Sequence, residues 1–250
     1  MSDIDAAYRA SSRYKIILGV DYGTTYSGTV LSRLRQYRLT FILGVSFVTT
    51  NKSGIDDINV ITTWPDHSFT EWKTPTRIAY FEENAEKIRQ TQWGFQVGPG
   101  LQSYSWMKLL LEKKVDLSEF DDPLLKSLYG GNILTLPSNK SAQDVCEGFL
   151  RELYNYTVSR LERELDARVF RRTPMEVWLT VPAMWTDEAQ AATRDAARAA
   201  GFGSRTHDTL RTIKEPEAAA LAAMKPHLGK TALDPIQVRA DVQISKNAVH

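Results

Sequence analysis

The feature that most constrains the fold is a short apolar run that ends in a turn rich in glycine and threonine. Residues 16–20 read Ile-Ile-Leu-Gly-Val, which is typical of a buried strand, and Asp21-Tyr22-Gly23-Thr24-Thr25 follows directly. Small residues let backbone N–H groups converge on a phosphate, and a carboxylate such as Asp21 suits a hydrated Mg²⁺. By pattern alone an ordinary hairpin turn is the simpler interpretation, because Asp, Gly and Thr are common in turns.

Strand and helix patterns alternate along the rest of the chain. Strands are expected at 45–49, 58–64, 76–80, 175–181 and 210–213, and helices at 101–114, 141–167, 188–200 and 215–224. Ser141 is a suitable helix cap with Asp144 three residues later, and Gly201 suits a helix end. The alternation predicts an α/β layered domain.

A second candidate for chemistry lies where the last strand meets the last helix. Pro216 fits the first turn of a helix, and it places Glu215 at the helix start. Glu215 is either a plain charge at the positive end of the helix or a carboxylate aimed at a site. No Gly-x-x-x-x-Gly-Lys-Ser/Thr segment occurs in the sequence, so a P-loop is not predicted.

Taken together, these segments resemble the nucleotide-binding domain of the 70-kDa heat-shock protein family, within the actin-like ATPase superfamily. The stretches that carry the resemblance are residues 19–28, 179–185, 192–201 and 214–222, and their order and spacing match the family. The resemblance extends from about 14 to 224 and is weak across 50–140. The tryptophans of this middle part resemble a divergent branch of the family found in fungi.

The resemblance implies a ribonuclease H-like, actin-like ATPase lobe, with a mixed sheet flanked by helices and a small inserted upper subdomain. The implied division is a flexible leader over 1–13, a core subdomain from 14–50 and 140–225, an inserted subdomain over 51–139 and a non-family tail over 226–250.

The resemblance also implies roles for individual residues. Asp21 would hold Mg²⁺ through water, and Gly23, Thr24, Thr25 and Tyr26 would line the β- and γ-phosphates of ATP or ADP. Glu215 would position the metal and the attacking water, Lys108 would contact the γ-phosphate, and Pro182 would belong to a switch toward a partner domain. The alternative for Lys108 is an ordinary exposed helix lysine. Positioning and charge neutralisation are what phosphoryl transfer requires.

The sequence departs from the family at two places. Residues 231–250 contain no second Asp-Gly-Gly-Gly-Thr type of turn, so we expect the first lobe only, with weak or absent ATP hydrolysis. Removal of residues 29–44 would join Gly28 to Val45 and restore a continuous return strand. We therefore expect a translated intron or insertion there, or else a genuine elongated hairpin, and residues 234–250 are expected to be read-through.

Composition limits the remaining function classes. The net charge is +1, so no strong field would attract nucleic acid or an anionic membrane, and the longest apolar patch, 39–48, is too short to span a bilayer. The single cysteine, Cys146, fits a cytoplasmic protein. The expected partners are nucleotide and client proteins or co-chaperones. The alternatives are a non-enzymatic interaction module or an incomplete gene-model fragment, while the segments around Pro182 and Glu215 disfavour a sugar kinase.

Overall fold

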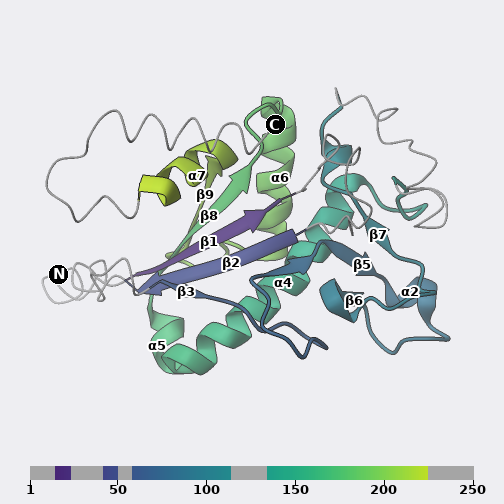
Figure 1. Ribbon diagram of the computed structural model, residues 1–250, viewed down its shortest axis with the longest axis horizontal. Coiled ribbons are helices and arrows are strands. Elements are labelled where there is room, and N and C mark those ends of the chain that lie inside the picture. The colour runs from purple at the N-terminus through teal and green to yellow at the C-terminus, as the bar shows by residue number, and fades with distance from the viewer. Residues whose placement is uncertain (1–14, 24–41, 50–57, 114–133, 225–250) are drawn as a thin grey trace, which may run out of the picture.

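The computed structural model describes residues 15–23, 42–49, 58–113 and 134–224 (Figure 1). Its main sheet contains β1 (Ile16–Tyr22), β2 (Ile42–Thr49), β3 (Asn59–Val60), β8 (Met175–Val181) and β9 (Thr209–Lys214) in the order β3-β2-β1-β8-β9, and β4 (Lys73–Pro75) also pairs with β2. β1, β8 and β9 are parallel, whereas β2 is antiparallel to its neighbours. The mixed sheet flanked by helices agrees with the expected α/β class.

Strict alternation of side chains builds the core of the sheet. In β1 and β8 every second residue is buried, from Ile16 to Tyr22 and from Met175 to Val181. Except for Val181, these side chains share one hydrophobic cluster with α4 (Ala142–Leu165) and α6 (Asp187–Ala200), which pack against each other. Alternating strands in parallel register therefore present one continuous apolar layer to two helices.

The helix ends follow the capping signals. Ser141 caps α4 in a capping box with Asp144, and Thr186 caps α6 by accepting a hydrogen bond from Ala189 N. α6 ends at Gly201, whose φ of 122° is open to glycine. The long helix predicted over 141–167 ends at Leu165 instead. Asp166, with φ 66°, starts the short helix α5 (Ala167–Arg172) by accepting from Arg168 N at 2.8 Å.

The helix predicted over 101–114 is wrong. Tyr104 and Ser105 form β7 (Tyr104–Ser105), which pairs with β5 (Arg77–Ala79), and β5 also pairs with β6 (Gln92–Trp93) in a second, three-stranded sheet. Trp106 then adopts a φ of 64°, which no α-helix accommodates. Between Trp106 and Lys113, where this described stretch ends, the chain forms one 3₁₀ turn, η3 (Leu109–Leu111). The apolar residues of this segment are buried by neighbouring segments on several sides. Their spacing in the sequence therefore resembles that of an amphipathic helix, although no such helix forms.

The strand predicted over 58–64 is shorter than expected. Ile61 N still donates to Val45 O at 2.9 Å, but the chain then leaves the sheet. Trp64 packs against Trp93 and Tyr156 and donates its indole N–H to Glu71 O at 2.8 Å. Burial of this aromatic ring outweighs further strand pairing. The strand predicted at 76–80 corresponds to β5.

The remaining elements are α2 (Phe81–Asn84), η2 (Gly94–Gln96) and α7 (Glu215–Met224), the last of which lies against β8 and β9 (Figure 1). None of the helices in the described part combines the length and apolar character needed to cross a bilayer. Thr24, Thr25, Tyr26 and the segments 1–13 and 226–250 lie outside the described residues. Of the segment 29–44, only 42–44 are described, and they begin β2.

Candidate functional site

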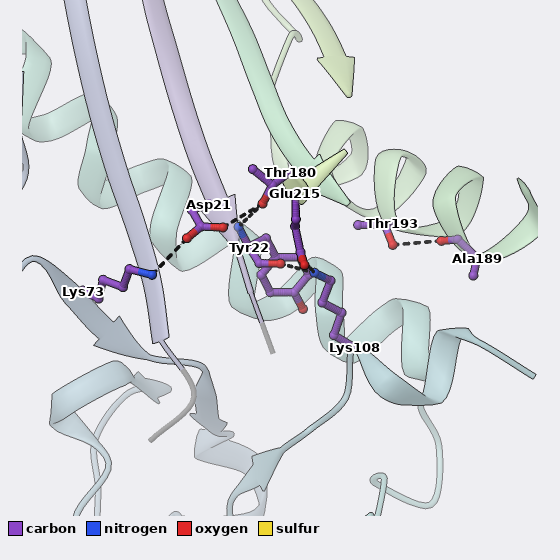
Figure 2. A network of polar contacts seen from close by, with 8 residues as sticks. All are labelled: Asp21, Tyr22, Lys73, Lys108, Thr180, Ala189, Thr193 and Glu215. Carbon is purple, nitrogen blue, oxygen red and sulfur yellow. Dashed lines mark hydrogen bonds and ion pairs between the residues drawn. The ribbon is translucent and has the colours of Figure 1, made fainter. Parts of the chain in front are cut away.

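The carboxyl ends of the three parallel strands meet at one edge of the sheet. β1 ends at Tyr22, β8 at Val181 and β9 at Lys214, which is followed directly by Glu215 at the start of α7. In open α/β sheets ligands bind at this edge. Two lysines from other segments reach the same place (Figure 2). We call the residues that meet here the strand-end cluster: Asp21, Lys73, Lys108, Thr180 and Glu215.

Asp21 is the carboxylate at the centre of the strand-end cluster. Its Oδ1 accepts a hydrogen bond from the Thr180 hydroxyl at 2.9 Å, and its Oδ2 pairs with Lys73 Nζ at 3.0 Å. Thr180 Oγ1 in turn accepts from Tyr22 N at 3.1 Å, which fixes the hydroxyl between two strands. Asp21 remains 42% exposed, and a carboxylate has further lone pairs to offer. It is therefore oriented by the fold and still accessible to a ligand.

Lys73 reaches Asp21 across an intervening strand. Asp21 pairs with Gly44 in β2, and Gly44 pairs with Lys73 in β4, so the three positions lie in one row across the sheet. Side chains directly opposite one another project from the same face, and two strand spacings separate the outer backbones by about 10 Å. Glycine has no side chain, and the long lysine stem passes over this position.

Lys108 occupies a different environment on the other side of β1. Its side chain is fully buried, and its Nζ donates to the carbonyl oxygen of Tyr22 and to Glu215 Oε1 at 3.2 Å. The ammonium also lies 5.1 Å from the ring centre of Tyr22 and 5.2 Å from that of Trp185. The interpretation of Lys108 as an exposed helix lysine is therefore wrong. It sits immediately before a 3₁₀ turn in a packed interior.

Burial controls the protonation of the groups behind the strand ends. It lowers the pKa of Lys108 from its usual 10.5, and the Glu215 charge opposes that shift. Burial raises the pKa of the Cys146 thiol to about 12 and raises the pKa of the Tyr22 phenol well above its usual value of 10. At neutral pH Cys146 and Tyr22 are therefore uncharged, and Glu215 is the partner that stabilises the Lys108 ammonium.

A buried carboxylate, Glu112, links the segment that carries Lys108 to the start of α6. Glu112 follows η3 and accepts hydrogen bonds from both Thr186 N, at 2.6 Å, and the Thr186 hydroxyl, at 2.9 Å. Thr186 is the cap of α6, so Glu112 ties the segment that carries Lys108 to the N-terminal end of that helix. The negative charge also faces the positive end of the helix dipole.

The structure brings together three of the residues singled out from the sequence. Asp21, Lys108 and Glu215 converge on the end of β1, and Gly23 follows that strand as a half-buried residue. Sequence reasoning missed Lys73 and Thr180. Thr180 could have been found as the polar residue that precedes the last position of a buried strand, whereas the proximity of Lys73 depends on a sheet register that no local pattern reveals.

The donor set fits a hydrated magnesium ion together with phosphate. Asp21 offers carboxylate oxygen, and Mg²⁺ commonly keeps most of its water. The Lys73 ammonium pairs with Asp21, and the Lys108 ammonium lies at the end of the same strand, against the Tyr22 carbonyl. Within the described ranges, no group of three or more His, Cys, Asp or Glu side chains is placed to enclose a metal directly. A metal bound here would be held by Asp21 through water, and it would supply charge neutralisation of the phosphates.

Comparisons with known proteins point to one family. Residues 151–224 match the model of the family described as Hsp70 protein. The chain is 37% identical over 90 residues to the Chaperone protein HscA homolog of Actinobacillus pleuropneumoniae serotype 5b (strain L20) and to that of serotype 3 (strain JL03). The aligned part is 36% of this chain and spans 12% of the length of these relatives. The family match includes Thr180 and Glu215 of the strand-end cluster, and it supports a relationship to the Hsp70 family of chaperone-type ATPases.

Proposed function

We propose that this chain is a nucleotide-binding lobe of an Hsp70-type chaperone ATPase, and that ATP or ADP with Mg²⁺ binds at the strand-end cluster. The observation that carries the proposal is the convergence of one accessible carboxylate, Asp21, with two lysines at the carboxyl edge of parallel strands. The partial family match supports the same class of protein.

The residues would divide the work as follows. Asp21 orients the water shell of the metal, and Thr180 holds the Asp21 carboxylate in place. Buried Lys108 pairs with the partly exposed Glu215, and the Lys108 ammonium fixes the position of the Tyr22 carbonyl, where the chain enters the turn at Gly23. Thr24, Thr25 and Tyr26 are proposed to contact phosphate through that turn. Pro182, which follows β8, is proposed to transmit the ligand state to a partner domain.

We further propose that the 250 residues bind nucleotide weakly and turn over little or no ATP. The sequence supplies one phosphate-binding turn, so a ligand would be contacted mainly from one side and stay partly hydrated. The proposed division remains a core over 14–50 and 140–225 with an upper subdomain over 51–139. Client proteins or co-chaperones and a cytoplasmic location also remain predictions.

A thermal-shift titration with ATP and Mg²⁺ tests this function. Ligand at about ten times its Kd stabilises the folded state by about 1.4 kcal/mol, which raises Tm by about 3–5 °C in a chain of this size. Asp21→Asn should abolish the shift, and Lys87→Met, which alters an exposed lysine bonded to Gly100 O, is the matched control. A non-enzymatic interaction module or an inert fragment would show no shift with 10 mM ATP in any variant.

The insertion hypothesis for residues 29–44 stays a proposal with its own test. Removal of the segment would place Gly28 before Val45, so a glycine would again precede the residue that pairs with Val20. Transcripts that lack the corresponding codons, and a shortened chain at least as stable as the full one, are expected. If every transcript contains these codons and the shortened chain fails to fold, the segment is a genuine hairpin.

A further inference from the structure

We propose that Lys73, rather than Lys108, is the lysine that contacts the phosphate groups of a nucleotide bound at the strand-end cluster. The inference rests on the proposed function and assigns a specificity role to a residue outside the segments that suggested that function. It follows from the different environments of the two lysines in Figure 2.

The Lys108 side chain is fully buried, and its ammonium group already has partners in the protein interior. An ammonium group has three N–H donors. Lys108 uses two of them for the Tyr22 carbonyl and Glu215, and its charge lies near the rings of Tyr22 and Trp185. To reach a ligand in solvent, the side chain would have to leave the Tyr22 carbonyl without its donor and open a fully buried position. This cation stabilises the end of β1 from inside.

Lys73 has the opposite character. Its side chain is 43% exposed, it lies on the short strand β4, and its ion pair with Asp21 is itself accessible to solvent. An exposed ion pair contributes little to stability, so it exchanges partners readily. In the row formed by Asp21, Gly44 and Lys73, the middle position carries no side chain between the lysine and the carboxylate.

Ligand binding would exchange the partners of Asp21 and Lys73. Mg²⁺ and the Lys73 ammonium are both cations, so a metal held by Asp21 through water would compete with the lysine for this carboxylate. The released ammonium is then available to a phosphate oxygen of the same ligand. With Lys73 present, the charges of the strand-end cluster cancel, whereas without it the cluster carries an excess negative charge that repels a polyphosphate.

The first experiment measures binding of ATP and of adenosine, each with Mg²⁺, to the 250-residue chain and its variants by equilibrium dialysis. Lys73→Met should weaken ATP binding by about tenfold to a hundredfold, as expected for loss of a charge-assisted hydrogen bond, and leave adenosine binding unchanged. Lys73→Arg should restore most of the ATP affinity. Lys87→Met is the control for loss of one exposed positive charge.

A second readout uses the unaltered protein. Brief acetylation followed by mass spectrometry should modify Lys73 in the free chain, protect it when Mg²⁺ and ATP are present, and leave Lys108 unmodified in both states. The inference is overturned if Lys73→Met binds ATP like the unaltered chain, or if ATP protects Lys108 instead. If the unaltered chain binds neither ATP nor ADP, the proposed function fails and the assignment of Lys73 falls with it.

Discussion

The ion pair between buried Lys108 and the partly exposed Glu215 makes a quantitative prediction about stability. The two charges lie 3.2 Å apart, which corresponds to an attraction of about 5 kcal/mol at an effective dielectric constant of 20. Glu215 is 37% exposed, so solvent screens part of this attraction, and we expect a loss of about 2 kcal/mol in Glu215→Gln. The amide retains an oxygen acceptor for Lys108, so the variant isolates the charge.

Lys108→Met should behave differently. It leaves the Tyr22 carbonyl without its donor, at a cost of about 1–3 kcal/mol, but it also removes the several kcal/mol needed to bury an ammonium. We expect the free energy of unfolding of Lys108→Met to lie within about 1 kcal/mol of that of the unaltered chain. Adding Glu215→Gln to Lys108→Met should then cost far less than Glu215→Gln alone, so the double-mutant cycle should give a coupling of about 2 kcal/mol.

Urea unfolding followed by circular dichroism measures both effects, with the midpoint expected to move and the slope to stay constant. A loss of about 2 kcal/mol corresponds to about 4–8 °C in Tm for a chain of this size. The reasoning is refuted if Glu215→Gln unfolds within 0.5 kcal/mol of the unaltered chain. It is equally refuted if the two changes add without coupling, since Lys108 would then not depend on Glu215.

The same pair predicts a direction for the pH dependence. The folded-state pKa of Lys108 lies below its usual 10.5, so between these two values the unfolded chain binds more protons, and the stability contribution of Lys108 rises with pH until about 10.5. Cys146 acts oppositely above pH 9, because its folded-state pKa is raised to about 12. Subtracting the pH profile of Lys108→Met isolates the lysine. In Glu215→Gln the rise should begin at a lower pH, and a profile identical to that of the unaltered chain would contradict this.

Three further predictions concern the supporting structure. Gly148→Ala should lower the free energy of unfolding by about 1–3 kcal/mol in urea melts, although alanine favours helices, because its Cβ would lie 2.7 Å from the Tyr80 hydroxyl; a stabilised variant would contradict this packing. Cys146, the single thiol of the chain, should resist iodoacetamide at pH 8 until urea unfolds the protein, and rapid native labelling would show that it is accessible. Arg205→Lys should cost about 1–3 kcal/mol in thermal melts, because Arg205 binds the buried Asp208 through two nitrogens and also donates to two backbone carbonyls; an unchanged Tm would refute this.

Local signals predicted the parts of the fold whose causes are local. The capping box at Ser141 and Asp144 and the alternation in residues 175–181 each specify an element through neighbours within a few positions, and the structure has both. The helix prediction around Trp106 was wrong because the causes of the local structure are not local. Its conformation follows from pairing of Tyr104 with Ile78 and from burial on several sides, neither of which a helical spacing of apolar residues can distinguish.

The strand-end cluster shows the same division. Asp21 and Glu215 could be singled out because each lies where a strand pattern meets a turn or a helix. Lys108 was singled out through the family resemblance. The resemblance indicated its place in the sequence, but it did not reveal that the side chain is completely buried against Tyr22 and Trp185. Lys73 depends on the register of β4 on β2 and of β2 on β1, and strand register is set by long-range pairing.

Equilibrium dialysis of Mg²⁺ and ATP against the 250-residue chain, compared with Asp21→Asn, tests the central claim most directly. The Asp21 side chain is 42% exposed and lies outside the hydrophobic core, so we expect a loss of binding in Asp21→Asn to report on the ligand rather than on folding. We expect weak, Mg²⁺-dependent binding of ATP to the unaltered chain and its loss in Asp21→Asn. Binding that is equal in the two proteins, or that does not depend on Mg²⁺, would contradict a nucleotide site at the carboxyl edge of the sheet.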